Sequence, residues 1–318
     1  MITTILILSV DEAALLEHSL PVALAQADAR VVVIANACTD STISTCERLG
    51  ADVIDIHERV SYAAAINVGL QRTGGRNVLL LNADCVLGGD FLQKAIRHLA
   101  RPHVGSVAPR LIRSLGMTEA DRLGVLDAAG MFLDRRRKNG LVGHGSLITA
   151  YPTSSEVFGG DGACVLYRRE VLDACAVGHE VLDEDMELWA SDVDLAWRAQ
   201  LMGWRCIYEP AAVAWHKRFY SPTTREGLPP AHRRLQFRNR LLMMAKNDTP
   251  GSLLRDLPRI AIYEVLALGH AVLRERALLR GYLDAARLFK RARVRRAVIQ
   301  QRRDPDRRVP FGLLPPHR

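Results

Sequence analysis

Short apolar runs alternate with helix-like segments over the first third of this 318-residue chain. The helix-like segments begin near Asp11, Asp40, Ser61 and Gly89. This alternation predicts an α/β fold in which helices pack on a largely parallel sheet. In such sheets, ligands bind beyond the carboxyl ends of the strands. The apolar runs are TTILILSV, ARVVVIANA, ADVIDI, RNVLLLNAD and VGSVAPRL.

Polar clusters stand where three of these strands end, at residues 9–12, 36–40 and 82–84. Because parallel strands end at one edge of a sheet, we expect the clusters to converge on one cleft. The third cluster places Asp84 directly after a buried strand. His216 ends a later apolar run, and it becomes a metal-ligand candidate if the fold brings it to Asp84, because hard cations accept carboxylate and imidazole together.

The segment SDVDLAWRAQLMG predicts a helix with acidic residues at its start. Ser191 and Asp194 have the spacing of a capping box, so we expect the helix to begin at Asp192 and to end at Gly203. The positive end of the helix dipole favours an ionised Asp192, and a positioned carboxylate can act as a general base. The simpler interpretation, that Asp192 and Asp194 are ordinary first-turn acids, stays open on local sequence alone.

A loosely patterned stretch, LDAAGMFLDRRRKNGLVGHGS, covers residues 126–146. It could belong to a pocket wall beside Asp161, Arg168 and Arg169. It could equally be a series of turns with solvated arginines.

Charge divides the chain into two parts. The net charge is +8, but residues 251–318 hold 16 Lys/Arg against 6 Asp/Glu, so residues 1–250 carry −2. We therefore expect one domain over 1–250 and a basic amphipathic helical extension over 251–318. Six scattered cysteines without a CxxC pair predict reduced thiols, and the short apolar N-terminus predicts a first strand and not a signal peptide. These features indicate a cytoplasmic protein.

The extension combines an apolar run with a basic helix. The run RIAIYEVLALGHAVL is too short to cross a bilayer. Beyond it, an apolar stripe and an arginine face favour a helix lying on an anionic membrane surface, although packing on the domain over 1–250 or on a second subunit stays open. Few aromatics interleave with the arginines, so we expect no nucleic-acid partner, and a nucleic-acid-binding protein acting through this basic tail is the less favoured alternative function. The stripe is Leu279, Tyr282, Leu283, Ala286 and Phe289, and the basic face is Arg276, Arg280, Arg287 and Arg291.

Four segments occur in the order that is typical of one family: VVVIANACTDST, SYAAAINVGLQRTGGRNVLLLNAD, GGDGACVLYRR and SDVDLAWRAQLMGWRCIYEPAAVAWH. Over roughly residues 1–250 the chain resembles the family 2 glycosyltransferases, particularly their rhamnosyltransferase-like bacterial branch. The resemblance implies a GT-A fold and an inverting transfer of a sugar, such as rhamnose, from a dTDP- or UDP-sugar. The implied acceptor is a glycan or a polyprenyl-linked glycan of a bacterial surface polysaccharide, at the inner face of the membrane. A homodimer is compatible with it.

The resemblance also implies roles for individual residues. Asp84, Asn82 and His216 take the positions that hold a divalent cation, Mn²⁺ or Mg²⁺, and Asp192 takes that of the catalytic base. The positions implied for the nucleotide or donor are Ser9, Asp11, Asn36, Asp40, Asn67, Ala83, Arg238 and Asn239, and those implied for the acceptor are Gly160, Asp161, Arg169 and Asp194.

Four positions depart from the family pattern. Ala35 replaces the usual Asp of the nucleotide motif, Asn82 replaces the first metal acid, Ser191 replaces the Glu before the base, and Ser61 replaces a turn glycine. A catalytically inactive relative that binds or scaffolds is the alternative that these departures leave open. A nicotinamide-dependent enzyme is disfavoured, since LSVDEAALL carries no GxGxxG after the first strand.

Overall fold

A computed structural model describes residues 2–218 and 227–317 of the chain, and its strands follow the predicted apolar runs. They are β1 (Thr3–Ser9), β2 (Ala29–Asn36), β3 (Asp52–Ile56), β4 (Asn77–Asn82), β5 (Cys85–Leu87), β6 (Val104–Ser114), β7 (Arg122–Ala128), β8 (Met131–Leu133), β9 (Asn139–Leu141), β10 (Ser155–Val157), β11 (Cys164–Arg168) and β12 (Arg205–Lys217).

Within the described residues, ten of these strands form one sheet with the path β10-β12-β6-β11-β4-β1-β2-β3, while β5 pairs with β12 and β7 with β6. Strands β4, β1, β2 and β3 are mutually parallel, and β12 is parallel to β6. Strand β11 runs antiparallel between β4 and β6. The predicted α/β architecture is therefore confirmed, with antiparallel strands added on one half of the sheet.

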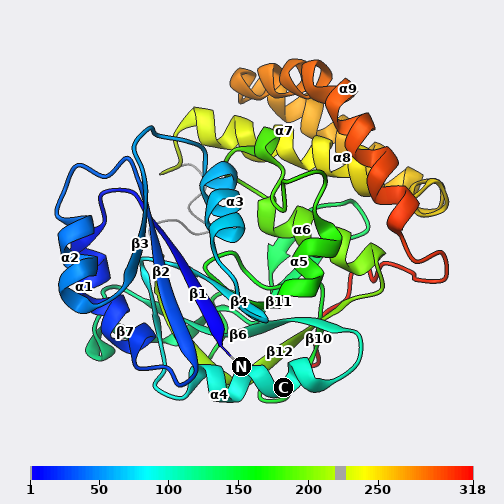
Figure 1. Cartoon of the computed structure of the whole chain (residues 1–318). Coiled ribbons are helices and arrows are strands. Elements are labelled where there is room, and N and C mark those ends of the chain that lie inside the picture. The colour runs from blue at the N-terminus through cyan, green and yellow to red at the C-terminus, as the bar shows by residue number, and fades with distance from the viewer. Residues whose placement is uncertain (1, 219–226, 318) are drawn as a thin grey trace.

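Helices cover both faces of the sheet and form a further layer beyond its edge. In Figure 1, α1 and α2 lie on one side of the sheet, α3, α5 and α6 lie on the other, and α7, α8 and α9 lie together at the top. The helices are α1 (Ala13–Leu24), α2 (Thr42–Leu49), α3 (Tyr62–Arg72), α4 (Phe91–Ala95), α5 (Arg169–Cys175), α6 (Ser191–Leu201), α7 (Pro230–Asn247), α8 (Pro250–Leu273) and α9 (Leu279–Arg302).

The two-residue period of the strands builds two cores. Ile5 and Ile7 of β1 face the core that includes α1, whereas Leu6 faces the core that includes α3. A Cβ on Gly69 of α3 would lie 2.4 Å from the Ile34 side chain, so the glycine allows α3 to approach the sheet closely. This packing fixes the strand ends where the polar clusters lie.

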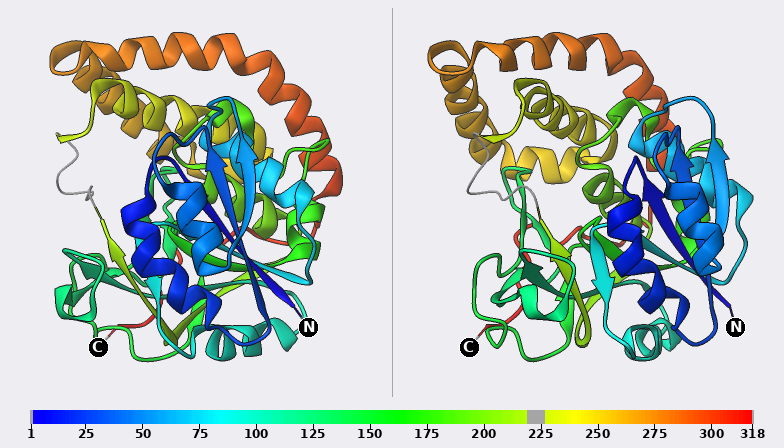
Figure 2. Two further views of the ribbon diagram at one scale, coloured as in Figure 1. Left: turned by 60° about the vertical axis from the view of Figure 1, so that its left-hand side comes forward. Right: turned by 90° about the vertical axis from the view of Figure 1, so that its left-hand side faces the viewer.

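A third core joins the C-terminal helices to α6. Trp197 of α6 packs with Met243 of α7 and Ile299 of α9, and its ring lies 5.3 Å from that of Phe311. After α9 the chain returns along the α/β part (Figure 2), where Gly312 donates its amide to the Leu133 carbonyl. The helical extension is therefore packed on the rest of the chain. Within residues 2–218 and 227–317, no helix combines the length and apolarity needed to cross a bilayer.

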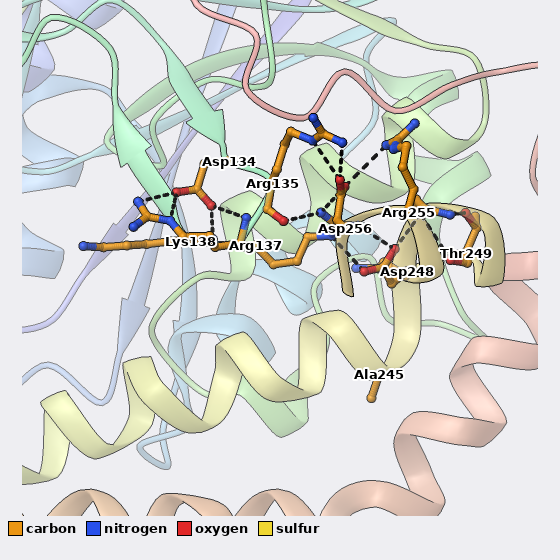
Figure 3. A network of polar contacts seen from close by, with 12 residues as sticks. Asp134, Arg135, Arg137, Lys138, Ala245, Asp248, Thr249, Arg255 and Asp256 are labelled. Atoms are coloured by element: carbon orange, nitrogen blue, oxygen red, sulfur yellow. Dashed lines mark hydrogen bonds and ion pairs between the residues drawn. The ribbon is translucent and has the colours of Figure 1, made fainter. Parts of the chain in front are cut away.

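A buried ion-pair network attaches α7 and α8 to the β8–β9 hairpin (Figure 3). The Arg137 side chain is 0% exposed and donates to Asp248 at 2.8 Å and to Asp256 at 2.9 Å. Arg135 adds a second cation on Asp256, at 2.5 Å. The interpretation of residues 126–146 as turns with solvated arginines is therefore wrong for Arg137. Arg168, which could have lined a pocket, donates instead to backbone carbonyls of the Leu99–Val104 segment.

We expect Arg137→Met to lower the free energy of unfolding by about 3 kcal/mol, because it leaves two buried carboxylates without their shared cation. The matched control is Arg136→Met. That arginine has a half-exposed side chain and a surface pair with Asp134, so its loss should cost less than about 1 kcal/mol. Urea unfolding followed by circular dichroism measures both values. Equal, small losses would show that the network does not hold the extension in place.

Candidate functional site

The three polar clusters lie at the same edge of the sheet, as expected, because β4, β1 and β2 are adjacent and parallel. Asp11 and Asp40 connect the loops after β1 and β2. Asp11 accepts hydrogen bonds from the backbone amides of Thr39 and Asp40, and Asp40 accepts one from Ala13, the first residue of α1. The Thr39 bond is the main reason that the pKa of Asp11 lies below its usual range.

Both carboxylates are exposed, which leaves oxygen atoms available to a ligand. Together with the Cys38 thiol, their donor atoms lie within 4.8 Å of one another. This group therefore also has the atoms to hold a cation.

Asp84 and His216 lie close together, which is the condition for a metal site formed by these two residues. The short strand β5 pairs antiparallel with β12, which sets His216 opposite Cys85, the residue after Asp84. Asp84 Oδ1 lies 3.2 Å from His216 Nε2, and His216 Nδ1 lies 2.8 Å from Asp127 Oδ2. A carboxylate behind the imidazole fixes the ring orientation, as in many metal sites.

The charges of this cluster fit a divalent cation. Asp84 Oδ1 is buried and has no conventional hydrogen-bond partner among the described residues. Burial opposes a charge on His216, but its bond to Asp127 and its ion pair with Asp84 raise the pKa of the imidazole well above its usual range, so a positive charge is favoured here. The 3.2 Å separation resembles the distance of about 3 Å between adjacent ligands of an octahedral cation with bonds of about 2.1 Å.

Glu12, at the start of α1, adds to this negative environment. Burial is the largest cause that raises the pKa of Glu12 to about 7, and the carboxylates of Asp84 and Asp40 raise it further. A cation beside Asp84 would offset this repulsion.

A continuous chain of contacts leads from the metal-ligand candidates to the predicted base. Arg218 donates to both oxygens of Asp127, at 2.7 and 2.9 Å, and to Asp161 at 2.6 Å. Asp161 also accepts from the Ala163 amide at 2.8 Å. In the same turn, the Gly162 amide donates to Asp192 Oδ2 at 3.0 Å.

Asp192 is partly exposed at the start of α6. A Cβ on Gly159 would lie 2.5 Å from the Ala196 side chain, so that glycine allows α6 to lie against the β10–β11 connection. Burial, and to a lesser extent the nearby Asp161 carboxylate, raise the pKa of Asp192 to about 6. A carboxylate with this pKa is ionised at neutral pH and can still accept a proton, which suits a general base.

The predicted capping box at this helix is wrong. Helix α6 begins at Ser191, Ala190 is its N-cap residue, and the Asp194 amide donates to the Ala190 carbonyl. The buried Ser191 Oγ has no hydrogen-bond partner within the described part of the chain. Asp194 is fully buried and bonded to Arg198, Lys246 and Asn247, which corrects its assignment to acceptor binding.

The turn before α6 has an unusual backbone. Glu187 and Ala190 adopt the left-handed region, with φ of 61° and 64°. Two α7 side chains hold this turn. Asn239 donates to the Met186 and Trp189 carbonyls, and Arg238 donates to Glu187 and to the Asp185 carbonyl. Both α7 side chains are buried, so the structure gives them a positioning role and corrects their assignment as direct donor contacts.

Several other predicted contacts are also structural. Asn36 bonds both backbone groups of Val60, and Asn67 bonds the backbone of Val181 and Leu182 and the Glu184 side chain. The Asn67 side chain has no donor or acceptor left for a nucleotide, which corrects its assignment. The Asn36 amide makes one donated and one accepted bond, so its nucleotide role stays a prediction. Ser9 and Ala83 are buried, and Gly160 packs against Val165. Asn82 donates its backbone N–H to the Ala163 carbonyl and its side chain is half-buried, so its role as a metal ligand stays a prediction.

Arg169 lies at the opposite edge of the sheet, because β11 ends beside Asn77, where β4 begins. Its guanidinium donates to the carbonyls of Leu70, Thr73 and Gly74 at the end of α3. The assignment of Arg169 to the acceptor wall is therefore corrected.

Four residues of the site were not singled out from the sequence: Glu12, Tyr62, Asp127 and Arg218. Tyr62 begins α3, and burial, with Asp192 and Asp161 nearby, raises the pKa of its hydroxyl well above the usual range. Asp127 lies in the loosely patterned stretch, which gave no signal for a single residue. Arg218 could have been suspected, since it follows His216 by two positions at a strand end.

Comparisons with known proteins identify the family and the fold. The model of the family named Glycosyltransferase like family 2 matches residues 2–239. No curated protein matches the chain.

Three solved structures show the likeness. The mannosyltransferase PcManGT from Pyrobaculum calidifontis, in complex with GDP-Man and Mn²⁺, is 20% identical, with a TM-score of 0.53 over 93% of this chain and 84% of that one. S. aureus TarS 1-349 in complex with UDP-GlcNAc is 14% identical, with a TM-score of 0.59 over 95% and 90%. GalNAc-T7 with UDP, GalNAc and Mn²⁺ is 12% identical, with a TM-score of 0.62 over 77% and 48%. The shared fold is GT-A.

Proposed function

The chain belongs to glycosyltransferase-like family 2, and from that premise we propose that it is an inverting, metal-dependent enzyme transferring a sugar from a nucleotide donor to a hydroxyl group. The observation that carries the proposal is the linked series Asp84, His216, Asp127, Arg218 and Asp161, which ends beside Asp192. It joins a place for a cation to a carboxylate that can take a proton. Residues 1–250 form the catalytic domain in this proposal.

Asp192 acts as the base. Its carboxylate accepts the proton of the acceptor hydroxyl as the oxygen attacks the anomeric carbon, and the bond from that carbon to the nucleoside diphosphate breaks on the opposite side. Attack from the opposite side inverts the anomeric configuration. Asp84 and His216 would hold a divalent cation, which would supply Lewis-acid stabilisation of the diphosphate as its charge develops.

The other residues support these two groups. Arg218 fixes Asp161 and Asp127 relative to each other, and Asp127 holds the imidazole of His216. Asp11 and Asp40 face the nucleotide from the neighbouring strand ends. Asn239 and Arg238 hold the turn that precedes α6, the helix that carries Asp192.

The donor and acceptor follow from the family resemblance. We propose a dTDP- or UDP-sugar donor, with rhamnose as the transferred sugar, and a glycan or polyprenyl-linked acceptor of a bacterial surface polysaccharide. Neighbours that bind GDP-Man and UDP-GlcNAc support a nucleotide sugar in general. We propose that the enzyme works in the cytoplasm, on the anionic inner face of the membrane, with residues 251–318 as its contact.

The pH dependence of nucleoside diphosphate release, measured over a panel of nucleotide sugars with Mn²⁺ and acceptor, tests this function. Below a pH of about 6, the pKa of Asp192, the base is protonated and kcat/KM should rise about tenfold per pH unit. Above that pKa the rate should level off. A rate that stays flat between about pH 5 and pH 8 would contradict the base assignment, and no release with any donor would contradict the function.

A further inference from the structure

Helix α8 exposes a wide apolar face. Leu254, Leu257, Ala261, Val265, Leu268 and Val272 recur every three or four residues, which places them along one side of the helix. The side is open to solvent, since Leu254 is 74% exposed, Val265 70% and Leu257 48%. Ile262 and Leu266 widen the face, and both are more than half exposed. Ordinary surface helices do not present so many large apolar side chains to water.

The apolar face continues into a groove. Its volume is about 410 Å³, and its lining is apolar except for Glu264: Val265 and Leu268 of α8, Leu241 and Met244 of α7, and Tyr282 of α9. The apolar surface is therefore shared by the three C-terminal helices.

Carboxylates of α8, of α9 and of the turn between them point toward the rest of the chain. Asp256 is buried against Arg137, and Glu264 pairs with Arg240 of α7. Glu275 and Asp284 pair with Arg233 and Arg234 of α7, at 2.6 and 2.7 Å. These are all the acidic residues between positions 250 and 302.

The outer surface keeps the opposite charge. Around the turn between α8 and α9, Arg274, Arg276 and Arg280 are exposed, and this turn projects at one corner of the molecule in both views of Figure 2. Along α9, Arg287 is also exposed, beside the apolar Leu283 and Val294. The outside of the extension is thus basic and apolar, while its acidic groups are neutralised inside.

We propose that the apolar face of α8 inserts into the interface of an anionic lipid bilayer, with the arginines of the α8–α9 turn and of α9 on the lipid head groups. Apolar burial and attraction to anionic lipid together set the strength of such binding. This deepens the membrane association of the proposed function, and rests on it, by naming α8 as the inserted element. A second copy of the chain is the other occupant that this face could take, and the exposed arginines beside the face favour anionic lipid instead.

Vesicle flotation of the full chain tests the inference, with mixed phosphatidylglycerol–phosphatidylcholine vesicles compared with phosphatidylcholine alone. The chain should bind the anionic vesicles, and added salt should weaken the binding. Ile262→Ser with Leu266→Ser should weaken it about tenfold by loss of apolar burial. Arg276→Gln with Arg280→Gln should weaken it by about tenfold and remove the preference for phosphatidylglycerol.

Leu115→Ser with Leu147→Ser is the matched control, since both leucines are exposed on the α/β part, at 71% and 66%. Its vesicle binding should equal that of the unaltered chain. Equal binding by the α8 variant and the control, or no vesicle binding by the unaltered chain, would overturn the inference. A dimer in vesicle-free buffer that Ile262→Ser with Leu266→Ser dissociates would assign the face to a second copy and overturn it too. Nucleotide-dependent melting of the same variants reports the donor site separately, so failure of the proposed function remains distinguishable.

Discussion

Asp192→Asn should lower the rate of sugar transfer by about 10³-fold and leave the affinity for the nucleotide sugar unchanged. The amide keeps the shape of the side chain, and its one oxygen can still accept from the Gly162 amide, although the bond from the Val193 amide to the other carboxylate oxygen is lost. It cannot take the proton of the acceptor hydroxyl. Because a base acts mainly in the transition state, kcat should fall and the Kd of the donor should not.

Ser191→Ala is the control for this variant. Ser191 neighbours Asp192 and is buried, and its hydroxyl has no bonding partner within the described residues, so the rate should stay near that of the unaltered enzyme. Transfer assays and donor titrations on the two variants measure the effect. If Asp192→Asn lost donor binding and transfer to the same extent, the carboxylate would be a ligand contact and not the base.

Asp84→Asn should lower transfer by about 10²- to 10³-fold and, unlike Asp192→Asn, should also remove the effect of Mn²⁺ on nucleotide binding. The Asp84 carboxylate supplies negative charge that balances a divalent cation. The amide of the variant is neutral, so His216 would be left without a charged ligand beside it. The same substitution should lower the pKa of Glu12, because the Asp84 carboxylate is one of the causes that raise it.

The measurement is a titration of the enzyme with nucleoside diphosphate at several Mn²⁺ concentrations. Melting without ligand is the control, because the variant must be folded for the comparison to hold. If nucleotide binding by Asp84→Asn kept its full dependence on Mn²⁺, the cation would have to bind elsewhere. The candidate site would then be the group formed by Asp11, Cys38 and Asp40.

The sheet edge could be predicted because its signals are local. Strands such as Thr3–Ser9 and Asn77–Asn82 are continuous apolar runs, and each ends at a polar residue. Parallel pairing then brings Asp11, Asp40 and Asp84 to one side of the molecule. The proximity of His216 to Asp84 could be predicted only from the family resemblance. It depends on the pairing of β5 with β12, which are more than a hundred residues apart in the sequence.

The assignments that failed depend on side-chain partners that sequence spacing does not reveal. Asn67 has the position of a nucleotide contact, but the chain near residue 181 folds over it and takes every hydrogen bond. Asp194 has the spacing of a helix cap, but Lys246 and Asn247 of α7 surround it. Arg137 belongs to a stretch whose composition is typical of solvated turns, but its side chain is the centre of a buried ion-pair network. Each partner lies more than fifty residues away.

The C-terminal extension, too, could be predicted from the sequence only in part. The amphipathic pattern of residues 279–291 predicted a basic helix, which α9 is. The pattern could not show that Tyr282 packs against Phe237 with ring centroids 4.8 Å apart, or that the wide exposed face belongs to α8. Both depend on how α7, α8 and α9 pack on one another.

Thermal melting with a panel of nucleoside diphosphates and nucleotide sugars, with and without Mn²⁺, tests the central claim most directly. A ligand that binds only the folded state raises the melting temperature by mass action. We predict a rise with one nucleotide that requires Mn²⁺ and that persists in Asp192→Asn but disappears in Asp84→Asn. No rise with any nucleotide would contradict a metal-dependent donor site at Asp84 and His216, and would favour a catalytically inactive relative.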